Sequence, residues 1–203
     1  MLLVMATRLN QKERTRREIV AAAARLLDEG QSTPSIDDVA EEALVSRATV
    51  YRYFDSVDDL LWQVYSDRHV LDAETAMDIA GRDLNQRVLA AEKNVNDYLF
   101  GDEDGTRTFE RVMLERIVQG RSTPEDRPGR RFEQIDAALG PLEERLDVHQ
   151  LRLVRHALSL AIGSQAMIAL LDTGRLDADL AREVTRFACE AITKEAERLA
   201  EAR

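Results

Sequence analysis

The chain has 203 residues, of which only 9 are glycine and 4 are proline, and its formal net charge is −10. This length can hold one or two small domains with a real core, and the scarcity of glycine and proline favours helix nearly throughout. The negative charge argues against a protein coated in nucleic acid, no apolar run reaches membrane length, and the single cysteine excludes an internal disulfide. We therefore expect an all-α protein of the reducing cytoplasm.

The first expected helix begins in a basic segment. It runs from about residue 11 to residue 29 and ends at Gly30, a residue common after helix C-termini. Residues 8–17 carry five basic side chains against Glu13 alone, a local charge of +4: Arg8, Lys12, Arg14, Arg16 and Arg17. The expected buried stripe is Ile19, Ala22, Ala23, Leu26 and Leu27. A basic first helix on an acidic body can orient a protein on DNA; the alternative is a solvated, frayed chain end.

The second expected helix begins after Pro34, which disfavours continuation of any preceding helix. The Ser35 side chain can accept from a free backbone N–H of the first turn, and Asp38 completes the spacing of a capping box. The apolar residues of this helix share one face: Ile36, Val39, Ala40 and Ala43.

The third expected helix extends from Ser46 to Phe54 after a break at residues 44–45. Val50 and Phe54 are four residues apart and pack inward, whereas the opposite face carries hydroxyl and guanidinium groups. Two short helices joined by a tight turn are typical of a helix-turn-helix, whose second helix enters the major groove of DNA. The predicted DNA contacts are Ser46, Arg47, Ala48 and Thr49 in the first turn, near base edges, and Arg16, Arg17, Tyr51, Arg52 and Tyr53 on phosphates.

Residues 43–60, Ala-Leu-Val-Ser-Arg-Ala-Thr-Val-Tyr-Arg-Tyr-Phe-Asp-Ser-Val-Asp-Asp-Leu, resemble the signature of the TetR (tetracycline-repressor-like) family. Residues 17–24 resemble the first helix of that family, so the resemblance covers about residues 14–61. It implies an all-α homodimer with a three-helix N-terminal domain that binds operator DNA. It also implies a C-terminal domain with a small-molecule pocket and the dimer surface.

The sequence departs from this family pattern at two positions. Leu44 occupies the place of a glycine in a turn that often has a left-handed backbone, a conformation that costs other residues ~1 kcal/mol. Val57 occupies the place of a lysine that meets a phosphate, and Asp55, Asp58 and Asp59 surround it with negative charge. We therefore expect operator binding that is weaker or more salt-sensitive than is usual in the family.

The rest of the chain is expected to form a helical bundle, with a domain boundary between residues 55 and 56. Residues 1–55 form the helix-turn-helix DNA-binding domain, and residues 56–203 the ligand-binding and dimerisation domain. The helix over residues 148–172 is apolar on more than one face, and the last helix offers a matching apolar stripe. We therefore expect these two helices to pair with their symmetry mates in a homodimer; the alternative is a larger monomeric core. The remaining helices are expected at 56–81, 83–100, 106–119, 130–146, 148–172 and 177–201, which makes about nine in total.

A pocket for a small-molecule effector is expected in this bundle, with Gln165 as a buried amide that needs a partner. Its candidate ligand-binding residues are Trp62, Tyr65, His69, Tyr98, Phe109, Met113, Arg116, Gln165 and Met167. The three histidines are scattered and no phosphate loop or nucleophile motif occurs, so we expect no metal, no cofactor and no catalytic residues.

The sequence therefore predicts a DNA-binding transcriptional regulator, a repressor that a small-molecule effector releases from double-stranded operator DNA. The alternative is a helical interaction protein with a weakened DNA-binding unit, which Val57 and the nearby acids motivate. A helical-bundle enzyme is a more distant third reading.

Overall fold

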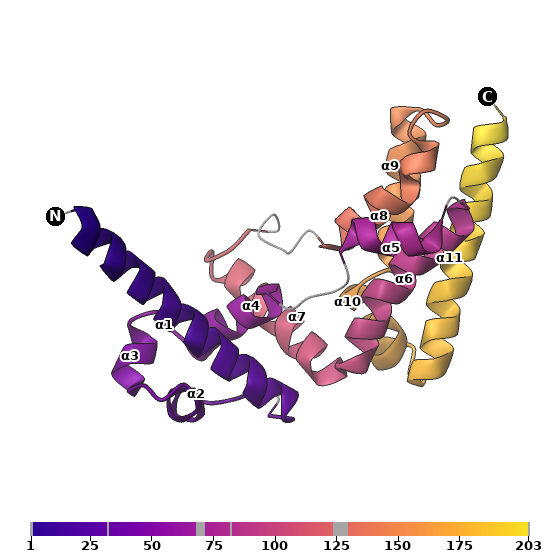
Figure 1. The fold of residues 1–203 in the computed structure, drawn as a ribbon. Helices are drawn as coiled ribbons and strands as arrows, with labels where there is room; N and C mark the ends of the chain where they lie inside the picture. Colours follow the sequence, from indigo (N-terminus) through magenta and orange to yellow (C-terminus); the bar gives the residue numbers. More distant parts are fainter. Residues whose placement is uncertain (1, 32, 68–71, 82, 124–129, 203) are drawn as a thin grey trace. The chain divides into compact units, whose positions relative to one another are not determined.

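The structure is a computed structural model that describes residues 2–31, 33–67, 72–81, 83–123 and 130–202. The predicted all-α fold is confirmed, but the described part holds eleven α-helices rather than about nine, because two of the expected helices are divided (Figure 1). The helices are α1 (Leu2–Asp28), α2 (Ile36–Glu42), α3 (Arg47–Tyr51), α4 (Val57–Asp67), α5 (Ala73–Ala80), α6 (Leu84–Gly101), α7 (Glu103–Val118), α8 (Arg130–Leu139), α9 (Val148–Ala161), α10 (Ser164–Ile168) and α11 (Ala178–Glu201), with a 3₁₀ turn at Gly140–Leu142 and a π-helical turn, η3, at Ala169–Thr173.

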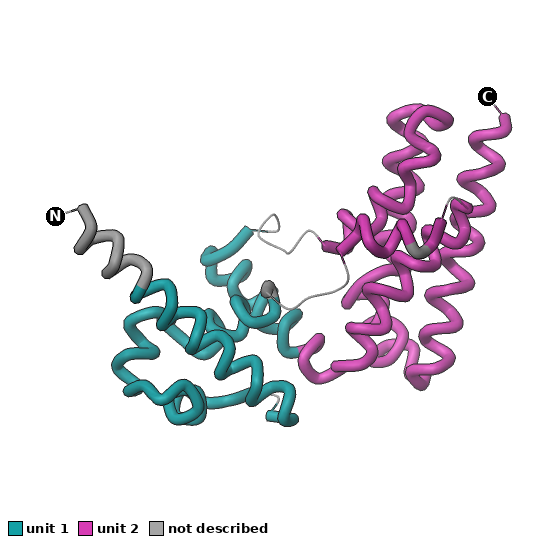
Figure 2. The backbone as a smooth tube through the Cα atoms, in the orientation of Figure 1, with its two compact units in different colours: residues 1–68, 108–126 teal, residues 69–107, 127–203 magenta. Residues whose placement is uncertain are grey.

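The chain forms two compact units (Figure 2). Unit 1 comprises residues 1–68 and 108–126, and unit 2 comprises residues 69–107 and 127–203. This division differs from the boundary expected after residue 55, because Leu60 and Val64 of α4 are buried in the core of unit 1. The assignment of a DNA-binding and a ligand-binding domain to the chain stays a prediction.

The core of unit 1 is built from the apolar faces that the sequence predicts for its first three helices. The buried residues are Ile19, Ala22, Ala23, Leu26, Ile36, Val39, Ala40, Val50, Phe54, Leu60 and Val64. The predicted capping box of α2 is confirmed: the Ser35 hydroxyl accepts from the backbone N–H of Asp38, whose carboxylate accepts from the backbone N–H of Ser35 at 2.9 Å. The Ser35 hydroxyl also donates to the Asp38 carboxylate at 2.7 Å, and this bond, together with the one from the Ser35 backbone N–H, lowers the pKa of Asp38.

The turn between α2 and α3 has the left-handed backbone that its resemblance implies. Leu44 has a φ of 54°, and its side chain is 92% exposed. The Cβ of Leu44 is therefore crowded against the backbone in this conformation. Its exposed side chain contributes almost no free energy of burial that could offset this strain.

Replacing Leu44 with glycine is expected to raise the free energy of unfolding by about 1 kcal/mol, because glycine adopts a positive φ without the Cβ clash. Urea denaturation of the variant and the parent protein measures the difference. Leu44→Ala is the matched control, since it removes the exposed side chain and keeps the Cβ. A gain that is equal in the two variants contradicts a backbone origin.

The expected helix over residues 56–81 is divided in the structure. α4 ends at Asp67 and α5 begins at Ala73, where the Asp72 carboxylate caps the new helix by accepting from the backbone N–H of Thr75 at 2.9 Å. The connection between the expected helices 83–100 and 106–119 is shorter than predicted: Asp102 alone separates α6 from α7 and accepts from the backbone N–H of Gly105.

The expected helix over residues 148–172 is also divided, at Gly163. This residue has a φ of 125°, which an L-residue rarely adopts, and so α9 ends at Ala161 and α10 begins at Ser164. The buried amide of Asn96 on α6 bonds both sides of the break: it donates to Ala161 O at 3.1 Å and accepts from Gly163 N–H at 2.9 Å. In the described part, no single helix is long and apolar enough to span a membrane; α9 and residues 164–173 reach that length and composition only together, as a pair bent by 49°.

The Asn96 network continues into α11. Glu92 is buried and accepts from the Asn96 amide at 2.9 Å and from the Thr185 hydroxyl at 2.7 Å. Near it, Cys189 is fully buried, and burial together with the negative charge of Glu92 raises the pKa of its thiol to about 12.

Cys189 is expected to be inert to thiol reagents in the native protein. With a pKa near 12, about one thiol in ten thousand is a thiolate at pH 8, and burial denies a reagent access to it. Reaction with Ellman's reagent should release no thionitrobenzoate from the folded protein and one equivalent per chain in guanidinium. Rapid reaction in native buffer contradicts this prediction.

Candidate nucleic-acid interface

The second helix of the helix-turn-helix, α3, presents one face to the core of unit 1 and the other to solvent. Val50 is fully buried, and Phe54, which follows the helix, is also buried. Ser46 caps the helix: its hydroxyl accepts from the backbone N–H of Thr49 at 3.1 Å. The exposed side chains are those of Ser46, Arg47, Ala48, Tyr51 and Arg52, all of which the sequence predicts as DNA contacts.

Two of the predicted base-reading side chains have partners in the free protein. Arg47 Nε forms an ion pair with Asp37 Oδ1 of α2 at 2.8 Å, and both side chains are more than half exposed. Thr49 is half-buried, and its hydroxyl hydrogen-bonds the Ser46 hydroxyl at 2.9 Å. Arg47 keeps its two terminal nitrogens for a base edge, whereas Thr49 has to exchange a partner before it can contact DNA.

Asp37→Asn is expected to tighten DNA binding about two- to fivefold, because it frees Arg47 from a surface ion pair worth less than about 1 kcal/mol. Fluorescence polarisation with a labelled duplex measures the change. Glu41→Gln, on the exposed face of the same helix, removes the same charge without touching Arg47. Equal gains from the two variants assign the effect to net charge and contradict the role of the pair.

The predicted phosphate contacts at the end of α3 lie on or beside its exposed face. Tyr51 is 48% exposed. The guanidinium carbon of Arg52 lies 5.2 Å from the centre of the Tyr53 ring, which is half-buried against the core of unit 1. Tyr51 and Arg52 thus stay accessible, whereas Tyr53 is partly engaged in packing.

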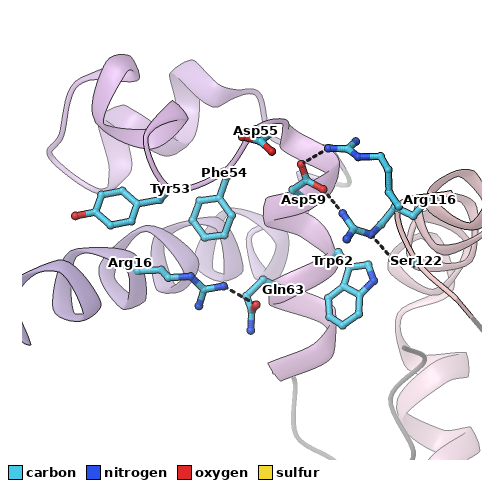
Figure 3. Close-up of a pocket in the computed structure, with 10 residues that line it drawn as sticks. Arg16, Tyr53, Phe54, Asp55, Asp59, Trp62, Gln63, Arg116 and Ser122 are labelled. Atoms are coloured by element: carbon cyan, nitrogen blue, oxygen red, sulfur yellow. Dashed lines mark hydrogen bonds and ion pairs between the residues drawn. The ribbon is translucent and has the colours of Figure 1, made fainter. Parts of the chain in front are cut away.

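The two predicted contacts on α1 differ in their surroundings. Arg17 is exposed and forms a long ion pair with Glu13, at 3.6 Å. Arg16 is half-buried: it donates to Gln63 Oε1 of α4 at 2.7 Å, and its guanidinium carbon lies 5.2 Å from the centre of the Phe54 ring (Figure 3). Arg16 therefore links α1 to α4 within unit 1, in addition to any contact it makes with phosphate.

The acids at the start of α4 are compensated within unit 1, which the sequence does not reveal. Asp58 accepts from Arg111 at 3.0 Å. Asp59 forms ion pairs with Arg116 and, at 2.9 Å, with Arg121 (Figure 3). The negative charge that would repel the DNA backbone at the start of α4 is therefore smaller than the sequence suggests, because Asp58 and Asp59 are paired with arginines and only Asp55 is left.

No feature of the sequence indicates these three arginines as partners of α4. The three pairs are separated along the chain by 53, 57 and 62 residues, so no local pattern could have indicated them. Val57, at the position where the family pattern has a lysine, packs against the core of unit 1 instead.

The nine residues predicted for an effector pocket fall in both units. In unit 1, Trp62 and Arg116 line one cleft, Tyr65 and Phe109 form an edge-to-face pair with ring centres 5.9 Å apart, and Met113 is fully buried. In unit 2, Met167 is fully buried beside Phe100, and Tyr98 is half-buried. Gln165 is exposed rather than buried, and it accepts from Arg131 at 2.8 Å; His69 lies outside the described residues.

Comparison with known proteins finds a family model and a solved structure that resemble this chain. Residues 19–64 match the family model of the bacterial regulatory proteins of the tetR family. The fold matches that of a solved protein from Mesorhizobium loti MAFF303099 that is proposed to be a TetR-family transcriptional regulator, with a TM-score of 0.58 and 20% identity over 89% of this chain and 96% of that one. A search of curated proteins finds no match to this chain. Residues 19–64, which include the helix-turn-helix of unit 1, are thus similar to the tetR family of bacterial regulatory proteins, and the all-α fold as a whole is shared with the solved protein.

Proposed function

We propose that the protein is a repressor that binds operator DNA as a homodimer and is released from it by a small-molecule effector. The observation that carries the DNA-binding part is the exposed face of α3, where Arg47, Tyr51 and Arg52 extend from a helix anchored by Val50 and Phe54. A short capped helix with a packed inner face holds its outer side chains at fixed positions, which reading a base edge requires.

Base recognition is assigned to Arg47, Ala48 and Thr49 and phosphate contact to the flanking side chains. Arg47 can give a bidentate pair of N–H donors to a guanine edge. Phosphate contact falls to Arg17, Tyr51, Arg52 and Tyr53, with Arg16 divided between phosphate and α4. Arg47→Ala should blur one base position of the operator, whereas Tyr51→Phe should weaken binding similarly for every sequence.

The homodimer is proposed to form through α9 and α11, which pack side by side in unit 2 (Figure 1). Both helices expose large apolar residues: Val148, Leu153 and Leu160 on α9, and Leu180, Val184 and Phe187 on α11. Leu160 and Val184 line the same apolar groove of about 300 Å³, so the exposed apolar faces of the two helices meet there. A monomer rarely leaves such a surface in water, and a two-fold axis would cover it with its own copy.

Release by an effector is proposed as a population shift. A ligand that prefers one conformation of α4 changes the separation of the two α3 helices of the dimer, and the half-sites of the operator can no longer be contacted together. The nine predicted pocket residues stay candidates for that ligand site. The proposal requires a compound that both raises the melting temperature and lowers operator affinity.

The test is a polarisation titration against the DNA upstream of the protein's own gene, at low and at physiological salt, with scrambled duplex as competitor. Sequence-specific binding that loses its preference at one base position in Arg47→Ala supports the regulator. Binding without sequence preference at either salt concentration contradicts it and favours the helical interaction protein. The paired state of Asp58 and Asp59 removes much of the reason for that alternative.

A further inference from the structure

A cleft of about 510 Å³ lies within unit 1, among α1, α4 and the end of α7 (Figure 3). Its size falls in the range of pockets that hold small organic ligands. Arg16 contributes from α1, Asp59 and Trp62 from α4, and Arg116 and Arg121 from the end of α7 and the segment after it. The cleft is separate from the apolar groove of unit 2 and from the exposed face of α3.

The cleft carries unmatched positive charge. Arg116 and Arg121 share the single carboxylate of Asp59, which leaves one positive charge over. Arg16 adds a second, because its partner Gln63 is a neutral amide and no ion pair to Arg16 occurs in the described part of the chain. Asp55, an exposed acid of the lining, subtracts one, so the five ionised side chains leave a net charge of +1. That balance suits a monoanion better than a dianion.

The same cleft has aromatic walls. Phe54 and Trp62 both contribute to its lining, and each already has an arginine over its ring, Arg16 at 5.2 Å and Arg116 at 5.6 Å. The indole Nε1 of Trp62 is buried, and no acceptor bonds it within the described residues. A flat ring can stack or pack edge-on against such walls.

We propose that this cleft binds a small aromatic carboxylate. The carboxylate pairs with Arg16, because one guanidinium nitrogen of Arg16 donates to Gln63 and the other two still carry N–H donors. The ring of the ligand lies against Phe54 and Trp62. Arg121 adds long-range attraction from the side of Asp59. This inference does not require operator binding by α3, although Arg16 is also a proposed phosphate contact.

Trp62 makes the site directly observable, because it is the only tryptophan of the chain. The probe is benzoate, titrated into the full-length protein while tryptophan emission is recorded, with N-acetyltryptophanamide in the same buffers as a correction for absorption and collisional quenching. We expect a saturable change with a Kd in the millimolar range or below, as the small size of the probe allows. An emission change that never saturates beyond this correction overturns the proposal.

Two analogues separate the charge from the ring. Benzamide keeps the ring without the charge, and cyclohexanecarboxylate keeps the charge without the aromatic face. Both should bind at least tenfold more weakly than benzoate. Benzamide binding as tightly as benzoate overturns the role of the carboxylate, and cyclohexanecarboxylate binding as tightly overturns the role of the aromatic walls.

Variants then locate the site. Arg16→Gln should weaken benzoate binding at least tenfold, and Arg16→Lys should restore part of it through its charge. Arg14→Gln, two residues earlier on the exposed face of α1, is the matched control and should bind as the parent does. Circular dichroism shows whether each variant is folded. If Arg16→Gln does not fold, Arg121→Gln replaces it as the test and should weaken benzoate binding two- to fivefold. If a folded Arg16→Gln variant binds benzoate as the parent does, the cleft is not the binding site. The same result for Arg121→Gln has this meaning when Arg16→Gln does not fold.

Discussion

The double substitution Leu160→Glu and Phe187→Glu is expected to convert the protein into a monomer. The two side chains are 79% and 73% exposed, on helices that pack together in unit 2. In the proposed dimer each would be covered by the partner, so glutamate at both positions would bury four unpaired charges across one two-fold interface. Operator affinity should fall about a hundredfold or more, because the second half-site is then no longer bound intramolecularly.

Sedimentation velocity measures the oligomeric state, and polarisation against the operator measures the affinity. Val118→Glu is the matched control: Val118 is also an exposed apolar residue, but it lies on α7 in unit 1. The control should remain dimeric and bind DNA as the parent does. A double variant that stays dimeric shows that another surface holds the two copies together.

Gly163→Ala is expected to lower the free energy of unfolding by about 3 kcal/mol. The backbone at residue 163, with φ 125° and ψ 176°, is open to glycine almost alone and costs another residue about 1 to 3 kcal/mol. A Cβ at this position would lie 2.7 Å from Nη1 of Arg131. That nitrogen donates to Ser159 O, Ile162 O and Gln165 Oε1, so its displacement also removes the cap at the end of α9.

Urea denaturation followed by circular dichroism measures this loss. Gly101→Ala is the control, because Gly101 lies in α6 without a positive φ and an added Cβ there meets nothing within 4 Å. It should be neutral or slightly stabilising. A Gly163→Ala variant as stable as the parent contradicts the explanation of the break between α9 and α10.

The helix-turn-helix could be predicted from the sequence because its determinants are local. The capping box of Ser35 and Asp38 spans three residues, Val50 and Phe54 lie one turn apart, and each feature survives unchanged in the structure. Even the left-handed backbone of Leu44 follows from its position in the turn. These signals need no knowledge of what the chain packs against.

The breaks in the longer helices and the partners of α4 could not be predicted in this way. Gly163 lies in an apolar run that reads as continuous helix, and the bonds that stabilise its open conformation come from Asn96, 67 residues earlier. Asp58 and Asp59 read as repulsive acids until arginines more than fifty residues away are placed beside them. Gln165 is exposed although its apolar neighbours in the sequence indicate a buried side chain. Such neighbours do not determine which face of a short helix is covered.

The most direct measurement for the DNA-binding role of α3 is the stoichiometry and footprint of the protein on its upstream DNA. Two chains should bind one duplex and protect two half-sites whose centres lie about 34 Å, one helical turn, or a multiple of it apart. Arg47→Ala should weaken the protection of both half-sites and relax the preference at one base position in each, while keeping the dimer. A single chain on the duplex, or protection that Arg47→Ala leaves unchanged, contradicts a paired recognition helix.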